Sequence, residues 1–277
     1  MFESLERQSG LPIALDPAGP ALTWAGGLAV GDVSPRTLHD LEPFLASVES
    51  RAATGPNPVV YTVYRDVRRP GDEATLRNAG LRFDLTVIAA GATIGRREFS
   101  RTAGHYHAPP PAGGAPFPEV YEVVAGRAYW LIQRPESDDP AVLEEIYAVE
   151  AGPSEKAVMP PGFGHVSVNA FSGPLVLANW VAADVGYDYE PYRRLRGGGY
   201  WFFEGTLPGT IEFISNPAYR QLPALVKLRP REVPALGLVR RQPAYALARE
   251  LNRLAFLRDP EAARRWLTID SCYRPVI

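Results

Sequence analysis

The feature that most restricts the fold of this chain is a run of short alternating segments between residues 81 and 185. The segments are rich in β-branched and aromatic residues, and Gly, Pro or Asp residues separate one from the next. They are LRFDLTVIAAG, EVYEVVAGRAYWLIQ, LEEIYAVEAG, KAVMPPG, HVSVNAF and PLVLANWVAA. Six or more strands at this spacing, without helices between them, predict an antiparallel all-β sandwich or barrel.

The sequence on either side of this run has a different character. NPVVYTVYRDV (57–67) alternates and predicts a further strand, whereas residues 36–52 have near-helical apolar spacing and predict a short helix. Further along, GGGYWFFEG is a Gly-rich turn that leads into aromatic residues, and AYALARELNRLAFL (244–257) predicts one helix. The chain is therefore expected to consist of an N-terminal extension packed on the barrel (1–56), a barrel (57–190) and a partly helical C-terminal extension (191–277).

The overall composition excludes several classes of partner. The formal net charge is −2, Lys156 and Lys227 are the only lysines, and no basic run is interleaved with aromatic residues, so we expect no nucleic-acid partner. The single cysteine, Cys272, excludes an intrachain disulfide and a CxxC metal site. No apolar run approaches the roughly 20 residues that span a bilayer, and the N-terminal segment does not resemble a signal peptide. We therefore expect a cytoplasmic protein without a membrane partner.

Three of the four histidines lie in two short motifs. His105 and His107 are two residues apart in TAGHYH, and because successive side chains of a strand alternate between faces, both imidazoles should project to the same side. The same alternation in PEVYEVV puts Glu119 and Tyr121 on one face and Glu122 on the other, so Glu119 is the candidate ligand.

The third histidine, His165, follows a Pro- and Gly-rich turn in MPPGFGHVSVN, which would direct its side chain toward the other two. A single histidine on a strand is more often structural, but three histidines confined to two motifs predict a metal site. Three imidazoles and one carboxylate suit one divalent transition metal ion, namely iron, manganese, nickel or zinc, rather than calcium or magnesium. The fourth histidine, His39, is interpreted as a surface residue of the N-terminal helix.

These motifs resemble the two motifs of the cupin family, which implies a double-stranded β-helix or jelly-roll barrel with additional N- and C-terminal helical segments. The matching residues of the first motif are His105, His107, Glu119 and Gly126, and those of the second are Pro160, Gly162, His165 and Asn169. The gap between His107 and Glu119 holds APPPAGGAPFP, which is longer than usual in the family, and we interpret it as a loop between two strands.

Within the cupins, the chain resembles the cupin-type glucose-6-phosphate isomerases, first associated with archaea. The resemblance covers about residues 57 to 190, and T-x-GHYH, EVYEVxxG and PPGxGHVxxN together are far more restrictive than the general cupin pattern. It implies interconversion of glucose 6-phosphate and fructose 6-phosphate in glycolysis and gluconeogenesis. It also implies a homodimer, in which the edges of the sheets would be covered, and Fe²⁺ as the first expectation among the possible ions.

The implied reaction needs an ion that polarises oxygens on C1 and C2 and a group that moves hydrogen between these carbons. By resemblance, Glu119 would be both a metal ligand and the base. A metal-bound carboxylate is a weaker base, so a hydride shift between C1 and C2 stays open as an alternative. Tyr121 would either contact substrate oxygens or pack inside the barrel.

The resemblance also implies where the phosphate group binds. The matching positions are Tyr61, Thr86, Thr102 and the backbone of Gly104, and Tyr189 would line the substrate pocket. No lysine lies near these motifs, so hydroxyl and backbone N–H groups would hold the phosphate. Ordinary strand threonines are the alternative interpretation of Thr86 and Thr102. Arg101, as a strand neighbour of Thr102, should face the other way.

Two positions depart from the family pattern. Tyr187 stands where members often have a histidine, and Val181 stands where archaeal members have a tyrosine. If that histidine opens the sugar ring, Tyr187 must replace it or spontaneous opening must suffice. The alternatives are mannose 6-phosphate as the substrate, an epimerase, a dioxygenase with the same ligand set, and a sugar-binding cupin without catalytic activity.

Overall fold

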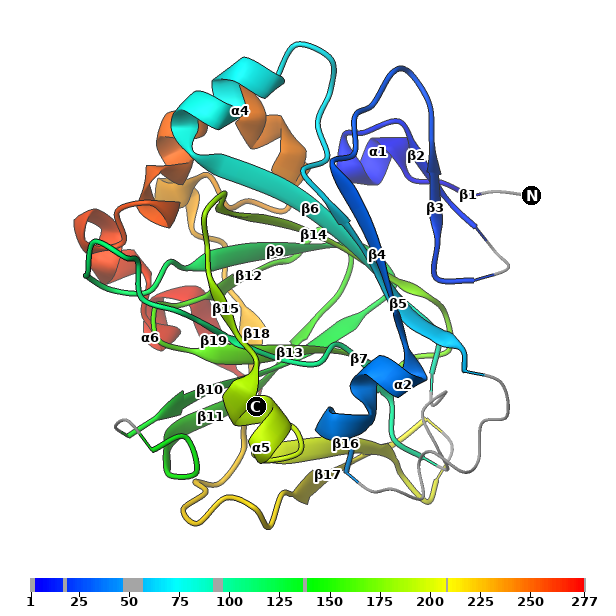
Figure 1. Ribbon diagram of the computed structural model, residues 1–277, viewed down its shortest axis with the longest axis vertical. Coiled ribbons are helices and arrows are strands. Elements are labelled where there is room, and N and C mark those ends of the chain that lie inside the picture. Colours follow the sequence, from blue (N-terminus) through cyan, green and yellow to red (C-terminus); the bar gives the residue numbers. More distant parts are fainter. Residues whose placement is uncertain are drawn as a thin grey trace.

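The structure, a computed structural model, describes residues 3–16, 19–46, 57–91, 97–136, 139–207 and 209–276. Two six-stranded sheets form a barrel, and helical segments lie around it (Figure 1). The chain passes repeatedly between the sheets, since β9, β12 and β14 belong to one sheet and β10, β11 and β13 to the other. The predicted all-β core of the cupin type, with N- and C-terminal helical segments, is confirmed.

The first sheet has the order β12, β9, β14, β6, β5, β4 and the second the order β19, β18, β11, β10, β13, β7. The strands of the first sheet are β12 (Lys156–Met159), β9 (Glu119–Ala125), β14 (Leu175–Ala182), β6 (Leu81–Ile88), β5 (Val59–Arg65) and β4 (Asp32–Thr37). Those of the second are β19 (Tyr273–Pro275), β18 (Val226–Pro230), β11 (Leu143–Ala151), β10 (Ala128–Pro135), β13 (Gly164–Asn169) and β7 (Ser100–Arg101).

Three smaller sheets complete the β structure. One joins β1 (Glu3–Ser4), β2 (Ile13–Leu15) and β3 (Leu22–Trp24), a second pairs β8 (Tyr106–His107) with β15 (Tyr187–Asp188), and a third pairs β16 (Tyr200–Glu204) with β17 (Ile211–Ser215).

The helical segments are short. The α-helices are α1 (Glu6–Ser9), α2 (Leu38–Leu41), α4 (Glu73–Ala79), α5 (Glu190–Arg194) and α6 (Ile269–Cys272). The 3₁₀ helices are η1 (Glu42–Phe44), η2 (Pro234–Leu236), η3 (Ala244–Arg249), η4 (Leu251–Leu257) and η5 (Glu261–Trp266). No helix among the described residues is long and apolar enough to cross a membrane.

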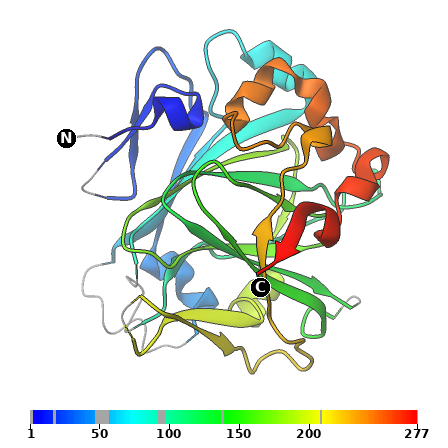
Figure 2. The ribbon, with the colours of Figure 1, turned by 180° about the vertical axis from the view of Figure 1, so that it is seen from behind.

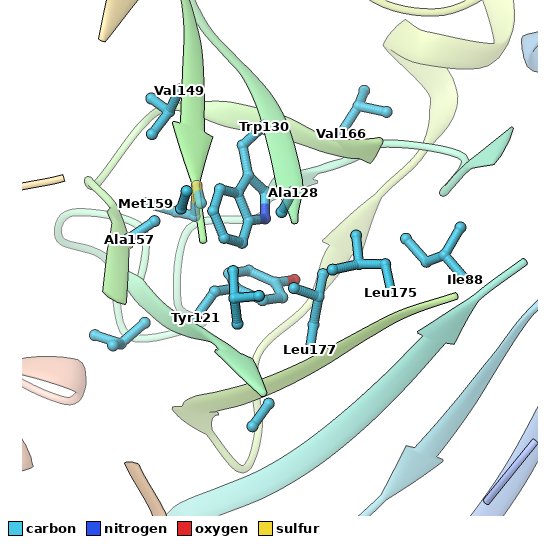
Figure 3. Close-up of a cluster of buried hydrophobic side chains, with 14 of the residues drawn as sticks. Ile88, Tyr121, Ala128, Trp130, Val149, Ala157, Met159, Val166, Leu175 and Leu177 are labelled. Carbon is cyan, nitrogen blue, oxygen red and sulfur yellow. The ribbon is translucent and has the colours of Figure 1, made fainter. Parts of the chain in front are cut away.

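The inner faces of the two sheets meet in a dense apolar core (Figure 3). Tyr121 of β9 and Trp130 of β10 face each other across it, with ring centroids 5.8 Å apart. Leu175 and Leu177 of β14 and Val149 of β11 are all 0% exposed beside them. Burying each such side chain contributes about 1.5–3 kcal/mol, so this layer holds the sheets in a fixed relation and thereby fixes the site between them.

The prediction of a helix over 36–52 is only partly right. Arg36 and Thr37 belong to strand β4, because the side chains of Thr37 and Asp40 form a capping box that starts the helix at Leu38. Pro43 lies in the 3₁₀ helix that follows α2, where it lacks the N–H group that a continuing α-helix would need. Residues 47–52 of the prediction lie outside the described residues.

The prediction of one helix over 244–257 is wrong. The segment forms two consecutive 3₁₀ helices, η3 and η4, because Glu250 between them leaves the helical region at φ −136° and ψ 45°. The amide of Glu250 still donates to the carbonyl of Leu247, and that of Arg253 to Glu250, both with i→i+3 spacing. Most of the apolar side chains, among them Leu247, Leu254 and Phe256, are buried all the same, and the segment packs on β14 and α4.

The C-terminal extension covers one edge of the second sheet. Strand β18 pairs in parallel with β11, and β19 pairs with β18, so the end of the chain returns to the barrel (Figure 2). The Tyr273 hydroxyl donates to the carbonyl of Val158 on β12. The unpaired edge that β11 would otherwise present is therefore closed by the same chain.

Candidate metal centre and substrate pocket

Three strands bring the predicted ligand residues together. His107 ends β8, Glu119 begins β9 and His165 lies near the start of β13. The backbone N–H groups of His105 and His165 each donate to the carbonyl of the other residue, at 3.2 and 3.0 Å, so the two motifs are joined directly. The rings of His105 and His107 stack at 5.3 Å between centroids, as the alternation of side chains predicts.

One potential ligand atom from each of the four residues lies within 4.8 Å of the others. The Oε2 atom of Glu119 is 3.3 Å from Nε2 of His107 and 3.3 Å from Nε2 of His165. Two imidazoles therefore converge on one carboxylate oxygen, and the His105 ring lies 4.4 Å from that of His165. This is the compact nitrogen and oxygen donor set that a transition metal ion requires.

Two of the four side chains are oriented by a hydrogen bond at the atom that does not face the other ligand residues. Nδ1 of His107 is 2.6 Å from the carbonyl oxygen of Phe117, which can only accept, so the proton is on Nδ1 and Nε2 keeps its lone pair. The Asn179 amide donates to Oε1 of Glu119 at 2.6 Å. Outer partners of this kind orient metal ligands in proteins.

The atoms that face one another are left without conventional partners. Nε2 of His105, Nε2 of His107 and Oε2 of Glu119 are buried and have no hydrogen bond within the part of the chain that the structure describes. Leaving such atoms buried and unsatisfied is costly, whereas a bound cation would satisfy all three at once. The residues present therefore fit a divalent ion.

The electrostatics of the cluster favour the forms that bind metal. Burial lowers the pKa of His105 well below its ordinary value, and the neighbouring imidazoles act in the same direction. Burial likewise lowers the pKa of His165, against the opposing effect of Glu119. Burial alone would raise the pKa of Glu119, but the close contacts of its carboxylate with His107 and His165 hold that pKa well below its usual range. The imidazoles of His105 and His165 are therefore neutral and the carboxylate is ionised near neutral pH.

The opposite face of β9 has a different role. Glu122 is 1% exposed and accepts from Nζ of Lys156 at 2.8 Å and from the backbone N–H of Ala244 at 2.6 Å. Lys156 also donates to the carbonyls of Val239 and Gln242 at 2.8 Å each. Glu122 thus fastens the C-terminal extension to the barrel, and Lys156 is fully engaged away from the predicted phosphate positions.

A pocket opens beside the four residues and contains every predicted substrate residue. Its lining includes Tyr61, Thr86, Thr102, Gly104, Tyr121, Tyr187 and Tyr189, together with His105 and Glu119. It also includes Arg36, Arg65, Asp84 and Asn179, which were not predicted from the sequence. Arg36 and Arg65 come from β4 and β5, and no local motif marks them. Arg101 points elsewhere, as expected, and bonds Glu98 at 3.0 Å.

The loop at Thr102 and Gly104 is fixed by close packing. The hydroxyl of Thr102 accepts from the backbone N–H of Ser167 at 3.0 Å. Gly104 has φ +83°, and a Cβ atom there would lie 2.6 Å from Val166 and 2.8 Å from Tyr192. Only glycine fits this position without displacing its neighbours, so the backbone can approach whatever the pocket binds.

The two departures from the family pattern lie in different surroundings. The Tyr187 ring lies 4.7 Å from that of His105, and its hydroxyl accepts from Arg82 at 2.6 Å. Arg82 in turn pairs with the buried Asp84 at 2.9 Å, and burial raises the pKa of Asp84 to about 6. Burial also raises the pKa of Tyr187 above its ordinary value, so Tyr187 can donate a proton in a hydrogen bond but is not a base. Val181 is fully buried in a small apolar cluster against Tyr187.

Comparison with known proteins agrees with the site. A family model described as glucose-6-phosphate isomerase matches residues 35–211. The glucose-6-phosphate isomerase of Pyrococcus furiosus is 30% identical over 211 residues, covering 74% of this chain and 98% of that protein. That of Thermococcus kodakarensis is 27% identical over 187 residues, covering 67% and 87%.

Similarity to solved structures is weaker. An oxalate oxidase has a TM-score of 0.34 at 17% identity, covering 51% of this chain and 61% of that one. The vicilin of hazelnut, Corylus avellana, has a TM-score of 0.33 at 12% identity, covering 46% and 31%. Likeness at this level supports no statement about function.

Proposed function

The chain belongs to the glucose-6-phosphate isomerase family, and on that premise we propose that it interconverts glucose 6-phosphate and fructose 6-phosphate with a bound divalent metal ion. The observation that supports this most is the convergence of His105, His107, Glu119 and His165 within 4.8 Å beside a pocket lined by hydroxyl groups. Such a site joins a Lewis-acid position to a surface that can bind a sugar.

His105, His107, Glu119 and His165 would hold the ion. Fe²⁺ is the first candidate, with Mn²⁺, Ni²⁺ and Zn²⁺ as alternatives, because the donor set suits any of them. When bound, the ion would supply Lewis-acid polarisation of the substrate oxygens on C1 and C2. Four protein ligands leave open positions on a six-coordinate ion for this purpose.

The remaining lining residues would bind and orient the sugar. Tyr61, Thr86, Thr102 and the backbone of Gly104 provide the hydroxyl and N–H groups for the phosphate. Tyr121 lies 3.2 Å from Nε2 of His165, close enough to contact an oxygen of the reacting carbons. Tyr189, whose ring centroid is 5.4 Å from that of His105, would contact the sugar beside the ligands.

The surroundings of Glu119 bear on how hydrogen moves between C1 and C2. Oε1 accepts from Asn179 and Oε2 faces the two imidazoles, and the pKa of the carboxyl is lowered. A carboxylate that holds its charge this strongly is a poor proton acceptor. We therefore propose that Glu119 acts as a ligand and that hydrogen passes as a hydride directly between C1 and C2, rather than through Glu119 as a base, while the hydroxyl proton moves from the oxygen of one of these carbons to that of the other.

The test is conversion of fructose 6-phosphate, with the glucose 6-phosphate formed detected by a coupled dehydrogenase. We expect activity that a chelator abolishes and a divalent metal restores, and product formed in D₂O that carries little deuterium at C1 or C2. Extensive deuterium incorporation would return Glu119 to the role of base. Activity that survives complete metal removal would contradict the proposal, as would none with any reloaded metal. Oxygen uptake with candidate substrates would identify a dioxygenase instead.

The homodimer and the cytoplasmic location stay predictions from the family resemblance. Strands β18 and β19 of the same chain cover the edge at β11. That edge therefore does not need a second subunit to cover it. The edge at β4 is one of those that stay unpaired among the described residues, although Pro35 lacks a donor there. The configuration at one carbon separates glucose 6-phosphate from mannose 6-phosphate, and measuring the fructose 6-phosphate formed from each sugar decides which is the substrate.

A further inference from the structure

An arginine and a tyrosine lie side by side on the wall of the pocket. Arg36 of β4 is the direct cross-strand partner of Tyr61 of β5, and both side chains line the pocket. Side chains of directly paired residues are neighbours on the same face of a sheet, roughly 4.5–5.5 Å apart at Cβ. A group bound by the Tyr61 hydroxyl is therefore within reach of the Arg36 guanidinium.

Arg36 forms no ion pair with a described residue, although the exposed carboxylate of Asp40 lies close enough to interact with it electrostatically. It is partly buried, and no carboxylate of a described residue comes within ion-pair distance of it. Its neighbour Arg65, which lines the same pocket, is already engaged: its guanidinium donates to Asp32 and to Ser34, both at 3.2 Å. The two arginines thus leave a net positive charge on this wall. The Arg36 guanidinium makes no hydrogen bond to another described residue, whereas that of Arg65 donates twice through Nη1.

The groups around Arg36 determine which anion would fit. Tyr61, Thr86 and Thr102 offer hydroxyl groups on the same pocket. Burial raises the pKa of Tyr61 to about 12, so its hydroxyl keeps its proton and remains a donor. Several neutral donors and one planar guanidinium suit the oxygens of a phosphate dianion, which arginine binds through paired hydrogen bonds.

The pocket therefore has two unlike ends. The four candidate ligands come from β8, β9, β13 and the segment before β8, whereas Arg36 comes from β4, which β14, β6 and β5 separate from β9 in the sheet. We propose that Arg36 binds the phosphate group of the substrate and so selects sugar phosphates over free sugars, with Arg65 in a lesser role. The inference rests on the proposed function for its substrate, but the anion site itself can be tested without turnover.

The experiment compares the wild-type protein with Arg36→Gln, which keeps a polar side chain but loses the charge, and Arg36→Lys, which keeps the charge. Arg77→Gln is the matched control, because it removes the same charge from the exposed helix α4, where Arg77 pairs with Glu73. Inorganic phosphate is titrated calorimetrically into each metal-loaded protein, and KM and kcat for fructose 6-phosphate are measured separately. Circular dichroism and thermal melting check that each variant folds.

A hydrogen bond to a charged group is worth enough that its loss should weaken phosphate binding about ten- to hundred-fold in Arg36→Gln. KM should rise by the same factor while kcat changes little. Arg36→Lys should lose much less, and Arg77→Gln should match the wild type. Phosphate affinity and KM in Arg36→Gln that equal those of Arg77→Gln would overturn the inference, and so would a fall in kcat alone.

The two proposals fail in different ways. If the wild-type protein does not convert fructose 6-phosphate but loses phosphate binding on Arg36→Gln, the isomerase proposal fails and the anion site stands. If the wild type is active and Arg36→Gln leaves phosphate binding intact, the anion site fails and the isomerase proposal stands. Should Arg36→Gln not fold, Arg36→Met, which keeps the apolar stem and loses the charge, takes its place. Phosphate affinity in Arg36→Met equal to that of Arg77→Gln then contradicts the inference.

Discussion

Strand β9 has two buried glutamates on opposite faces, and their surroundings differ. Glu119 faces the pocket, where one carboxylate oxygen accepts a hydrogen bond from Asn179 and the other lies 3.3 Å from the Nε2 atoms of His107 and His165. Glu122 faces the C-terminal extension, where both oxygens accept hydrogen bonds from the chain, one from Lys156 and one from Ala244. The residues are three positions apart and nearly equally buried, at 2% and 1% exposed.

The difference separates a ligand from a structural residue. The chain satisfies Glu122 completely, so that carboxylate needs nothing from outside. It leaves Oε2 of Glu119 without a hydrogen-bond donor among the described residues, which is tolerable when a cation completes the site. Burial pushes the pKa of both carboxyls upward, but the pKa of Glu119 ends below its usual value and that of Glu122 above it. The same side chain thus has opposite chemistry on the two faces.

The largest effect is expected from Glu119→Gln. This substitution keeps the shape of the side chain and removes the anionic ligand. Because changing even an outer partner of a metal ligand typically costs about 10–100-fold, losing the ligand itself should lower activity by more than about 100-fold. Metal content, measured by elemental analysis after dialysis, should fall with it, while the circular dichroism spectrum stays that of a folded protein.

His105→Ala and His165→Ala should give the same result as Glu119→Gln, since each removes one ligand from the same cluster. Metal content that stays at the wild-type level in any of these three variants would show that the ligand set is wrongly assigned.

The matched substitution Glu122→Gln should have the opposite effect: it should lower the stability of the protein and leave metal binding unchanged. Lys156 is 4% exposed, so losing its partner leaves a buried charge uncompensated, at a cost of about 3–5 kcal/mol. For a chain of this size, each kcal/mol lowers Tm by about 2–4 °C. Calorimetry should therefore show clear destabilisation with metal content per folded protein unchanged. A variant that keeps its Tm but loses metal would break the comparison between the two faces.

The smallest effect concerns pH. Metal binding requires neutral imidazoles and an ionised carboxylate, and the pKa values of His105, His165 and Glu119 are all lowered. As pH falls through about 6.5, where an ordinary histidine protonates, the binding forms should persist, and metal should be released only at lower pH. Metal content after dialysis at a series of pH values tests this. Glu122→Gln should follow the wild-type curve, and release near pH 6.5 in the wild type would contradict the sign of the shifts.

The sequence predicts well which side chains of the candidate metal centre share a face of a strand, and the reason is physical. The period of two along a strand is a local property, so the sequence alone assigns His105 and His107 to one face and Glu119 and Glu122 to opposite faces. The sequence also predicts the loop between His107 and Glu119. It does not predict that the carbonyl group of Phe117, near the end of this loop, orients His107, because that contact involves the backbone and no particular side chain.

Other features of the pocket depend on strand pairing, which local sequence does not specify. Asn179 reaches Glu119 because β14 pairs with β9, and Arg36 reaches the pocket because β4 pairs with β5. The apolar spacing of the residues after Arg36 predicts that Arg36 belongs to a helix. The capping box at Thr37 starts the helix at Leu38 instead, so Arg36 stays in β4. The prediction of one helix over 244–257 is wrong for a similar reason. Its apolar spacing reflects which side chains pack against β14, and it does not show whether the helical backbone is continuous.

The parallel pairing of β18 with β11 has a consequence for the order in which the protein assembles. Tyr147 and Val226 become neighbours only when most of the chain exists, and such distant pairing delays folding. During translation, β11 is synthesised before β18, so the outer edge of β11 stays unpaired and can bind other chains or chaperones. Final closure of the barrel must therefore wait until translation is almost complete.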